Sequence, residues 1–197
     1  MANYLGLKVD ANQQARAAVP DLCYQLMIDE LNARLTLTLM ESTATITVNA
    51  ESEALPADFR EGRHLYLDTD PRRVIQIKSE FSANACRSDS GMPAEAVVVD
   101  GALLFAPTPD GEYTAKLRYL ASLPELSADT DTSDVMDAHY GLYLFGALKH
   151  YAILSGDDAA EVRWTRAFET AVAAAEKSDT RKRYGASPLT MTPLAVA

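Results

Sequence analysis

The spacing of the apolar residues changes twice along this chain, and that change constrains the fold more than any other feature. In residues 20–36 apolar residues recur at steps of three and four, which predicts an amphipathic helix. Within 41–120 they alternate with polar and β-branched residues, a pattern typical of strands. Helical spacing returns over 133–155 and 157–180. A β module thus lies between helices from both ends of the chain, which predicts an α+β fold.

Individual residues support these boundaries. Pro20 suits a first helical turn, where its missing N–H would have no partner in any case, and Gly156 favours a helix end. The dipeptide Asp100-Gly101 lies between two apolar runs and predicts a two-residue hairpin turn. We therefore expect an α-helical bundle formed by N- and C-terminal helices, with an antiparallel β insertion, as a single domain over 20–183.

The two ends of the chain lie outside this predicted domain. Residues 1–19 are weakly patterned and are expected to form an arm or a short helix; they lack the continuous apolar core of a signal peptide. Residues 184–197 contain Pro188 and Pro193, which prevent a continuous helix, yet they are too apolar for a simple solvated tail. We expect an extended C-terminal arm that orders against a partner.

The charge balance excludes some classes of partner. The chain has 18 Lys and Arg against 28 Asp and Glu, a formal charge of −10, which argues against nucleic acid and anionic membranes as primary partners. No stretch approaches the roughly 20 apolar residues of a membrane-spanning helix. Cys23 and Cys86 are too few for a disulfide scaffold and are expected to be small buried hydrophobes in a protein made in the cytoplasm.

No catalytic, cofactor or metal site is predicted. The sequence has no phosphate-binding loop, dinucleotide fingerprint, nucleophile elbow or paired-cysteine motif. The acidic run Asp129, Asp131 and Asp134 does not fit a calcium loop, because an aspartate stands where the loop needs glycine and Tyr140 where it needs glutamate. A stripe of aromatic residues is expected to be a core between two helices and consists of Tyr140, Tyr143, Tyr151 and Trp164.

The three histidines leave one enzymatic alternative. His139 and His150 are roughly 16 Å apart along a helix at 1.5 Å per residue, so they would not share a metal ion. His64 lies in the β module and could act with Asp58 or Asp68, which would make the protein a small acid/histidine hydrolase.

The order of elements resembles that of the head-tail adaptor (connector) proteins of tailed bacteriophages. The resemblance extends from about residue 20 to residue 184. It rests on a series of short segments in order: Leu-Asn-Ala-Arg-Leu at 31–35, the threonine-rich segment 41–47, Leu-Pro-Ala-Asp-Phe at 55–59, Asp-Pro-Arg-Arg at 70–73, Pro-Asp-Gly-Glu-Tyr at 109–113, Leu-Arg-Tyr at 117–119 and Tyr-Leu-Phe-Gly-Ala-Leu at 143–148.

This resemblance implies a structural virion protein without catalysis. Family members form a homo-oligomeric ring, typically a dodecamer, beneath the portal protein at the head-tail junction. The ring extends the DNA channel, through which the genome passes without specific binding, and offers a platform to tail or nozzle proteins. No membrane is involved. The alternative within the virion neck is another tail-completion or stopper protein.

The resemblance also implies roles for the C-terminal residues. Arg181, Lys182 and Arg183 are the candidate hinge of the arm, although a helix C-terminus by itself favours cations at these positions. The candidate portal-binding residues of the arm are Tyr184, Pro188, Leu189, Met191, Pro193, Leu194 and Val196.

Overall fold

The computed structural model describes residues 21–81, 89–125 and 132–185, and these form two compact units. The β unit is Met40–Ser122, and the helical unit comprises the described parts of Met1–Leu39 and Leu123–Ala197. Each unit has a core of its own, so each is described by itself.

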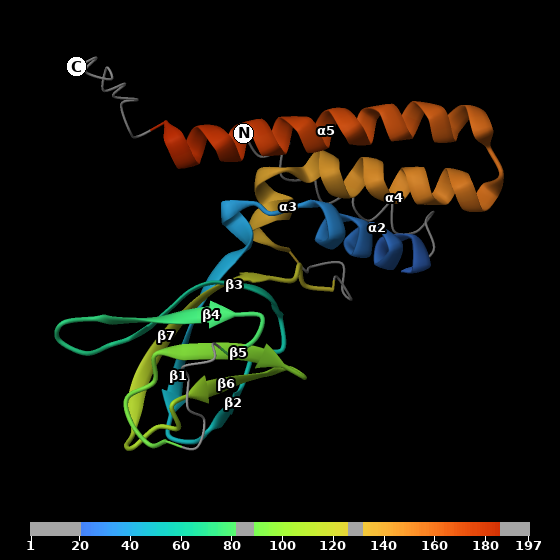
Figure 1. Ribbon diagram of the computed structural model, residues 1–197. Coiled ribbons are helices and arrows are strands. Elements are labelled where there is room, and N and C mark those ends of the chain that lie inside the picture. The colour runs from blue at the N-terminus through green and yellow to red at the C-terminus, as the bar shows by residue number, and fades with distance from the viewer. Residues whose placement is uncertain (1–20, 82–88, 126–131, 186–197) are drawn as a thin grey trace, which may run out of the picture. The chain divides into compact units, whose positions relative to one another are not determined.

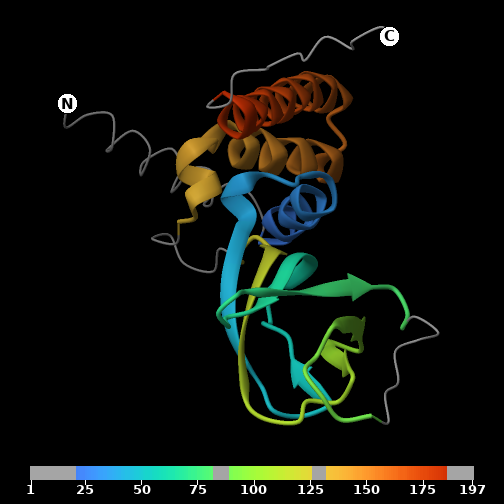
Figure 2. The ribbon, with the colours of Figure 1, turned by 60° about the vertical axis from the view of Figure 1, so that its left-hand side comes forward.

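The β unit is a single seven-stranded sheet (Figure 1). Its strand order is β1-β7-β3-β4-β5-β6-β2, and β1 and β2, at the two ends of this order, also contact each other. The sheet is therefore nearly closed and barrel-like, as Figure 2 shows. The strands are β1 (Glu41–Val48), β2 (Ser52–Ala54), β3 (Phe59–Leu67), β4 (Arg73–Lys78), β5 (Glu95–Val99), β6 (Ala102–Ala106) and β7 (Tyr113–Ala121).

Alternation along the strands fills the interior of the sheet. In β7, Ala115, Leu117 and Tyr119 are buried, whereas Lys116 between them is half-buried and Arg118 is exposed. The predicted turn at Asp100-Gly101 joins β5 to β6, with positive φ angles of 48° and 76°. The buried core residues are Ile46, Val48, Leu65, Leu67, Ile75, Ala96, Leu103, Phe105, Ala115, Leu117 and Tyr119.

The helical unit contains α2 (Asp21–Arg34), α3 (Asp134–Ala138), α4 (Tyr140–Ser155) and α5 (Asp158–Tyr184). Ser133 caps α3 by accepting from the Met136 N–H at 3.1 Å, and Asp157 caps α5 by accepting from the Ala160 N–H at 2.9 Å. Gly156 ends α4 in the left-handed conformation, with φ 69°. The chain therefore turns back sharply, and α4 and α5 lie side by side (Figures 1 and 2).

Helices α2, α4 and α5 pack closely against one another and form the core of this unit. Gly146 of α4 lies so near α2 and α5 that an added Cβ would be 2.7 Å from Met27 Cγ and 3.1 Å from Phe168 Cε2. The absence of a side chain at Gly146 therefore allows these helices to pack closely. The buried residues around this point include Cys23, Met27 and Leu31 of α2, Leu142, Tyr143 and Ala147 of α4, and Phe168, Val172 and Ala175 of α5.

The predicted fold class, a bundle of N- and C-terminal helices with an antiparallel β insertion, is wrong. The strands form a nearly closed barrel-like sheet with its own core, and the helices are chiefly the C-terminal region α3–α5, to which α2 is added. The sheet is also mixed, because β4 and β5 are parallel, with Gln76 opposite Glu95. Alternation reveals that a segment is a strand, but it contains no information on the direction of its neighbour.

Two helix boundaries also differ from those expected. The stretch 133–155 contains two helices, because the backbone of His139 (φ −138°, ψ 53°) interrupts it. Helix α5 continues past residue 180 to Tyr184. The candidate hinge residues Arg181, Lys182 and Arg183 are therefore in its last turn, and the predicted arm beyond residue 185 lies outside the described residues.

Candidate interaction site at the C-terminal end of helix α5

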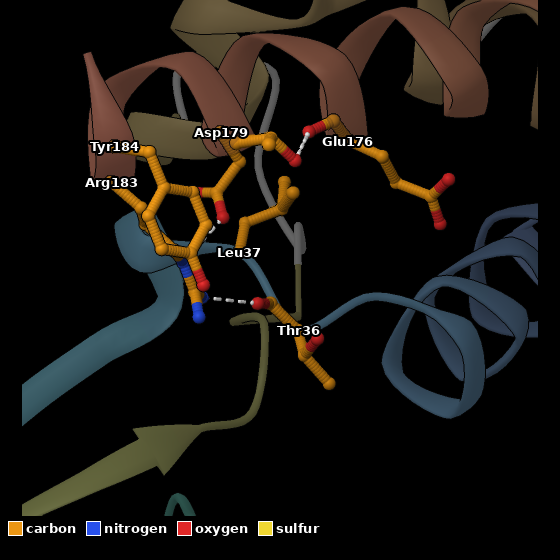
Figure 3. A pocket seen from close by; sticks show the side chains of 7 residues that line it. Thr36, Leu37, Glu176, Asp179, Arg183 and Tyr184 are labelled. Atoms are coloured by element: carbon orange, nitrogen blue, oxygen red, sulfur yellow. Dashed lines mark hydrogen bonds and ion pairs between the residues drawn. The ribbon is translucent and has the colours of Figure 1, made fainter. Parts of the chain in front are cut away.

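A pocket of about 290 Å³ lies where the last turns of α5 meet the segment that follows α2 (Figure 3). Both walls belong to the helical unit. Its lining is mainly polar and charged, and it consists of Thr36, Leu37, Glu176, Asp179, Thr180, Arg183 and Tyr184.

Asp179 is the buried charge of this pocket, with only 9% of its surface exposed. One carboxylate oxygen accepts from the Thr38 N–H at 2.7 Å, and the other pairs with Arg183 Nε at 2.7 Å. Burial alone would raise the pKa of Asp179, but the Thr38 hydrogen bonds and the Arg183 charge together hold it below its usual value. The carboxylate is therefore ionised and paired at neutral pH.

Arg183 completes the connection between α5 and the segment 36–38. It donates from Nε to Thr38 Oγ1 at 2.9 Å and from Nη2 to the Thr36 carbonyl at 2.7 Å. Asp179 and Arg183 are four residues apart on one helix, so they face the same segment. We call this pair with Thr36 and Thr38 the latch. It fixes the end of α5, and thus the point from which the C-terminal residues leave.

The contacts of the latch predict that the stability of the protein depends on Asp179 and on pH. Replacing Asp179 with asparagine is expected to lower the free energy of unfolding at pH 7 by about 1.5–3 kcal/mol, because the buried carboxylate and its charge-assisted hydrogen bonds to Thr38 and Arg183 are lost. The pKa of Asp179 in the folded protein is below its unfolded value of about 3.9. The difference in free energy of unfolding between wild type and Asp179→Asn is therefore fully present above the unfolded pKa, and it is lost as the pH falls through the lower folded pKa.

Urea denaturation at pH 7 and pH 3 measures this difference. The control is Glu176→Gln, which removes an exposed carboxylate from the same helix and pocket. An Asp179→Asn variant as stable as the control at pH 7 would contradict the role of the latch.

A second charged cluster joins three helices of the same unit. Arg34 of α2 pairs with Glu169 of α5 through two contacts of 2.7 Å, and Glu30 of α2 binds Lys149 of α4 at 2.6 Å and His150 at 3.0 Å. Burial alone would raise the pKa of Glu30, but Lys149 and His150 lower it below its usual value. His150 therefore has a structural partner, and the cluster holds the helices in register.

A model of the SU10 adaptor protein family matches residues 2–192. The chain belongs to this family. The SU10 family is one of phage head-tail adaptors, so the predicted resemblance to head-tail adaptors is confirmed. The adaptor is a structural protein of a bacteriophage virion, and its family implies interaction with other head or tail proteins. No curated protein matches the adaptor by sequence.

The structure places only some of the predicted interaction residues. Arg181, Lys182 and Arg183 are exposed in the last turn of α5, and Tyr184 is 65% exposed beside the pocket. The other candidate residues of the arm lie outside the described residues; they are Pro188, Leu189, Met191, Pro193, Leu194 and Val196.

The structure does not pair the residues of the enzymatic alternative, His64 with Asp58 or Asp68. Asp58 accepts from the Tyr119 hydroxyl at 2.9 Å, and Asp68 pairs with Lys116 at 3.1 Å. In the described part of the chain, no hydrogen bond or ion pair joins either carboxylate to the exposed His64. Both carboxylates therefore have structural partners within the β unit.

The other residues considered in the sequence analysis either have structural positions or lie outside the described residues. Burial and the charge of Lys182 lower the pKa of His139, which connects α3 to α4. Asp134 begins α3, whereas Asp129, Asp131 and Cys86 lie outside the described residues. Within residues 21–81, 89–125 and 132–185, no cluster of His, Cys, Asp or Glu is arranged to hold a metal ion, and no helix is long and apolar enough to cross a membrane.

The aromatic stripe and Cys23 are mostly core, as the sequence indicated. Tyr143 is buried, Tyr140 and Trp164 are half-buried, and Trp164 stacks on Phe145 with ring centroids 6.1 Å apart. Cys23 is fully buried, and burial raises the pKa of its thiol. Tyr151, at 39% exposure, departs from the stripe and faces solvent.

Proposed function

We propose that the adaptor forms a ring of about twelve copies beneath the portal, where it extends the DNA channel and provides a platform for the tail. The match of the SU10 adaptor family to residues 2–192 is the observation that supports this proposal. A closed ring gives every copy the same environment, which suits a protein that joins two symmetric assemblies.

The charge of the adaptor supports a channel through which DNA slides. Each copy has 28 acidic and 18 basic side chains, a formal charge of −10. A lining rich in lysine and arginine would bind phosphates and hold the DNA in place. A net acidic protein avoids that attraction, so the genome passes without specific binding.

The C-terminal arm is the proposed contact with the portal. It begins at the latch, where Tyr184 is 65% exposed, and continues through the apolar residues of 186–197. Ordering such a segment costs about 1–2 kcal/mol of backbone entropy per residue, which burial of its leucine, methionine and valine side chains would offset. Arg183, which belongs to the latch, and its neighbours Arg181 and Lys182 are the proposed hinge.

Truncation tests the arm directly. Removing residues 187–197 is expected to weaken portal binding by about tenfold or more, because the apolar anchor residues are lost together. The protein core should remain folded, since the described helices and strands all end before residue 186. Surface plasmon resonance on the immobilised portal measures the affinity, and the fluorescence of Trp164 reports folding of the helical unit.

A full-length control separates the effect of the apolar side chains of the arm from the effect of its length. The variant Leu189→Ser, Met191→Ser and Leu194→Ser keeps all 197 residues but removes three large apolar side chains. It should bind the portal as weakly as the truncated chain. Wild-type affinity in both variants would show that the arm is not the portal contact.

A further inference from the structure

The turn between α4 and α5 exposes large aliphatic side chains. Ile153 and Leu154, in the last turn of α4, are 47% and 52% exposed, and Val162, in the second turn of α5, is 71% exposed. Asp158 and Glu161 flank them with negative charge. We call these five residues the tip; the turn that carries it is at the opposite end of α5 from Tyr184 (Figure 1).

The fold of a single chain accounts for the charges of the tip but not for its apolar residues. Aspartate and glutamate in the first turn of α5 stabilise the helix dipole. Exposed aliphatic residues do not contribute to the helix in this way. Single exposed apolar residues are common on proteins, but three near one turn between two helices are typical of a surface that binds a partner.

The other end of α5 has the complementary character. Lys177, Arg181 and Lys182 are exposed there. Within residues 176–184 of α5, Glu176 is the acidic side chain that remains once Asp179 is paired with Arg183, which leaves 3 − 1 = +2 charges on this stretch. The pocket of about 290 Å³ lies on the same turns of α5, and its lining includes Leu37 and Tyr184, which is 65% exposed. We call this surface the basic end. It combines positive charge with a mainly polar recess that contains Leu37 and Tyr184, whereas the tip combines negative charge with apolar side chains.

The tip and the basic end of one chain are too far apart to meet. Helix α5 has 27 residues, which span about 40 Å at 1.5 Å per residue. A contact between two different surfaces of identical chains is heterologous, and such contacts generate closed rings when the rotation between neighbours closes.

We propose that the tip of one adaptor copy docks at the basic end of the next copy, with Leu154 and Val162 toward the pocket and Asp158 and Glu161 toward the lysine and arginine side chains. This inference rests on the ring of the proposed function and assigns the surfaces that join its subunits. Because Asp158 is exposed and Glu161 is only half-buried, high salt should weaken the contact.

Charge reversal with rescue tests this pairing without the portal. Asp158→Lys with Glu161→Lys, and separately Arg181→Glu with Lys182→Glu, should each weaken self-association by about tenfold or more, because like charges would then meet. A chain with all four changes should recover self-association, since the charges are again opposite. Sedimentation velocity over a range of protein concentrations measures the effect.

The apolar part of the tip has a matched control in the β unit. Val162 is 71% exposed and Val74 of β4 is 69% exposed. Val162→Asp should reduce self-association, whereas Val74→Asp should leave it at the wild-type level. Equal effects of the two changes would overturn the assignment of the tip.

Disulfide trapping gives a readout that does not depend on the stability of the ring. In a Cys86→Ser background, a chain with Leu154→Cys and Thr180→Cys should form a ladder of linked copies on oxidation, whereas either cysteine alone should not extend beyond dimers.

The inference is overturned if the wild-type protein stays monomeric and the double-cysteine chain gives no ladder. A chain that forms the ladder but does not bind the portal overturns the proposed function instead. Loss of portal binding in Val162→Asp with unchanged self-association would assign the tip to the portal and likewise overturn the inference.

Discussion

Replacing Phe168 with alanine is expected to lower the free energy of unfolding of the helical unit by about 3–5 kcal/mol. Phe168 is fully buried on α5, and its ring lies against the closest approach of the helices at Gly146. The guanidinium of Arg34 and the ammonium of Lys149 lie 5.6 and 5.0 Å from the ring centroid. The substitution therefore removes a large apolar group and two cation–π contacts together.

Urea denaturation followed by Trp164 fluorescence measures this loss, because Trp164 is the sole tryptophan of the chain and lies in the same unit. Tyr151→Ala is the matched control, since it removes a 39% exposed ring from α4 and should cost less than about 1 kcal/mol. Similar costs for the two substitutions would contradict the packing described for Phe168.

The β unit depends in the same way on Phe105. This residue of β6 is fully buried in the core of the sheet, and its alanine variant should be less stable by about 3–5 kcal/mol. Amide hydrogen exchange measured on peptides from β4, β5 and β6 should accelerate. Val99→Ala, at a 42% exposed position of β5, is the control and should leave exchange nearly unchanged. Wild-type exchange in Phe105→Ala would show that this ring does not support the sheet.

Features set by neighbouring residues could be predicted from the sequence. The turn at Asp100-Gly101 needs only two residues that tolerate positive φ, and the structure has it. Gly156 ends a helix as predicted, and Asp157 caps the next one. These motifs act over a few residues of chain, so a single sequence contains all the information they require.

Features that join distant residues could not be predicted. The parallel pairing of β4 and β5 depends on the path of the chain between them, which alternation does not encode. The hydrogen bond from Thr38 to Asp179 joins residues 141 positions apart. The resemblance implies that Arg183 is a hinge residue, but no local pattern reveals its bonds to Thr36 and Thr38.

The mass of the adaptor in the presence of the portal tests the central claim most directly. Size-exclusion chromatography with light scattering, on the full chain mixed with the portal protein of the same phage, measures both association and stoichiometry. We expect a saturable complex that contains about twelve adaptor copies per portal ring, because identical chains with heterologous contacts close into a ring. A folded adaptor that elutes apart from the portal at every ratio would contradict the proposed function.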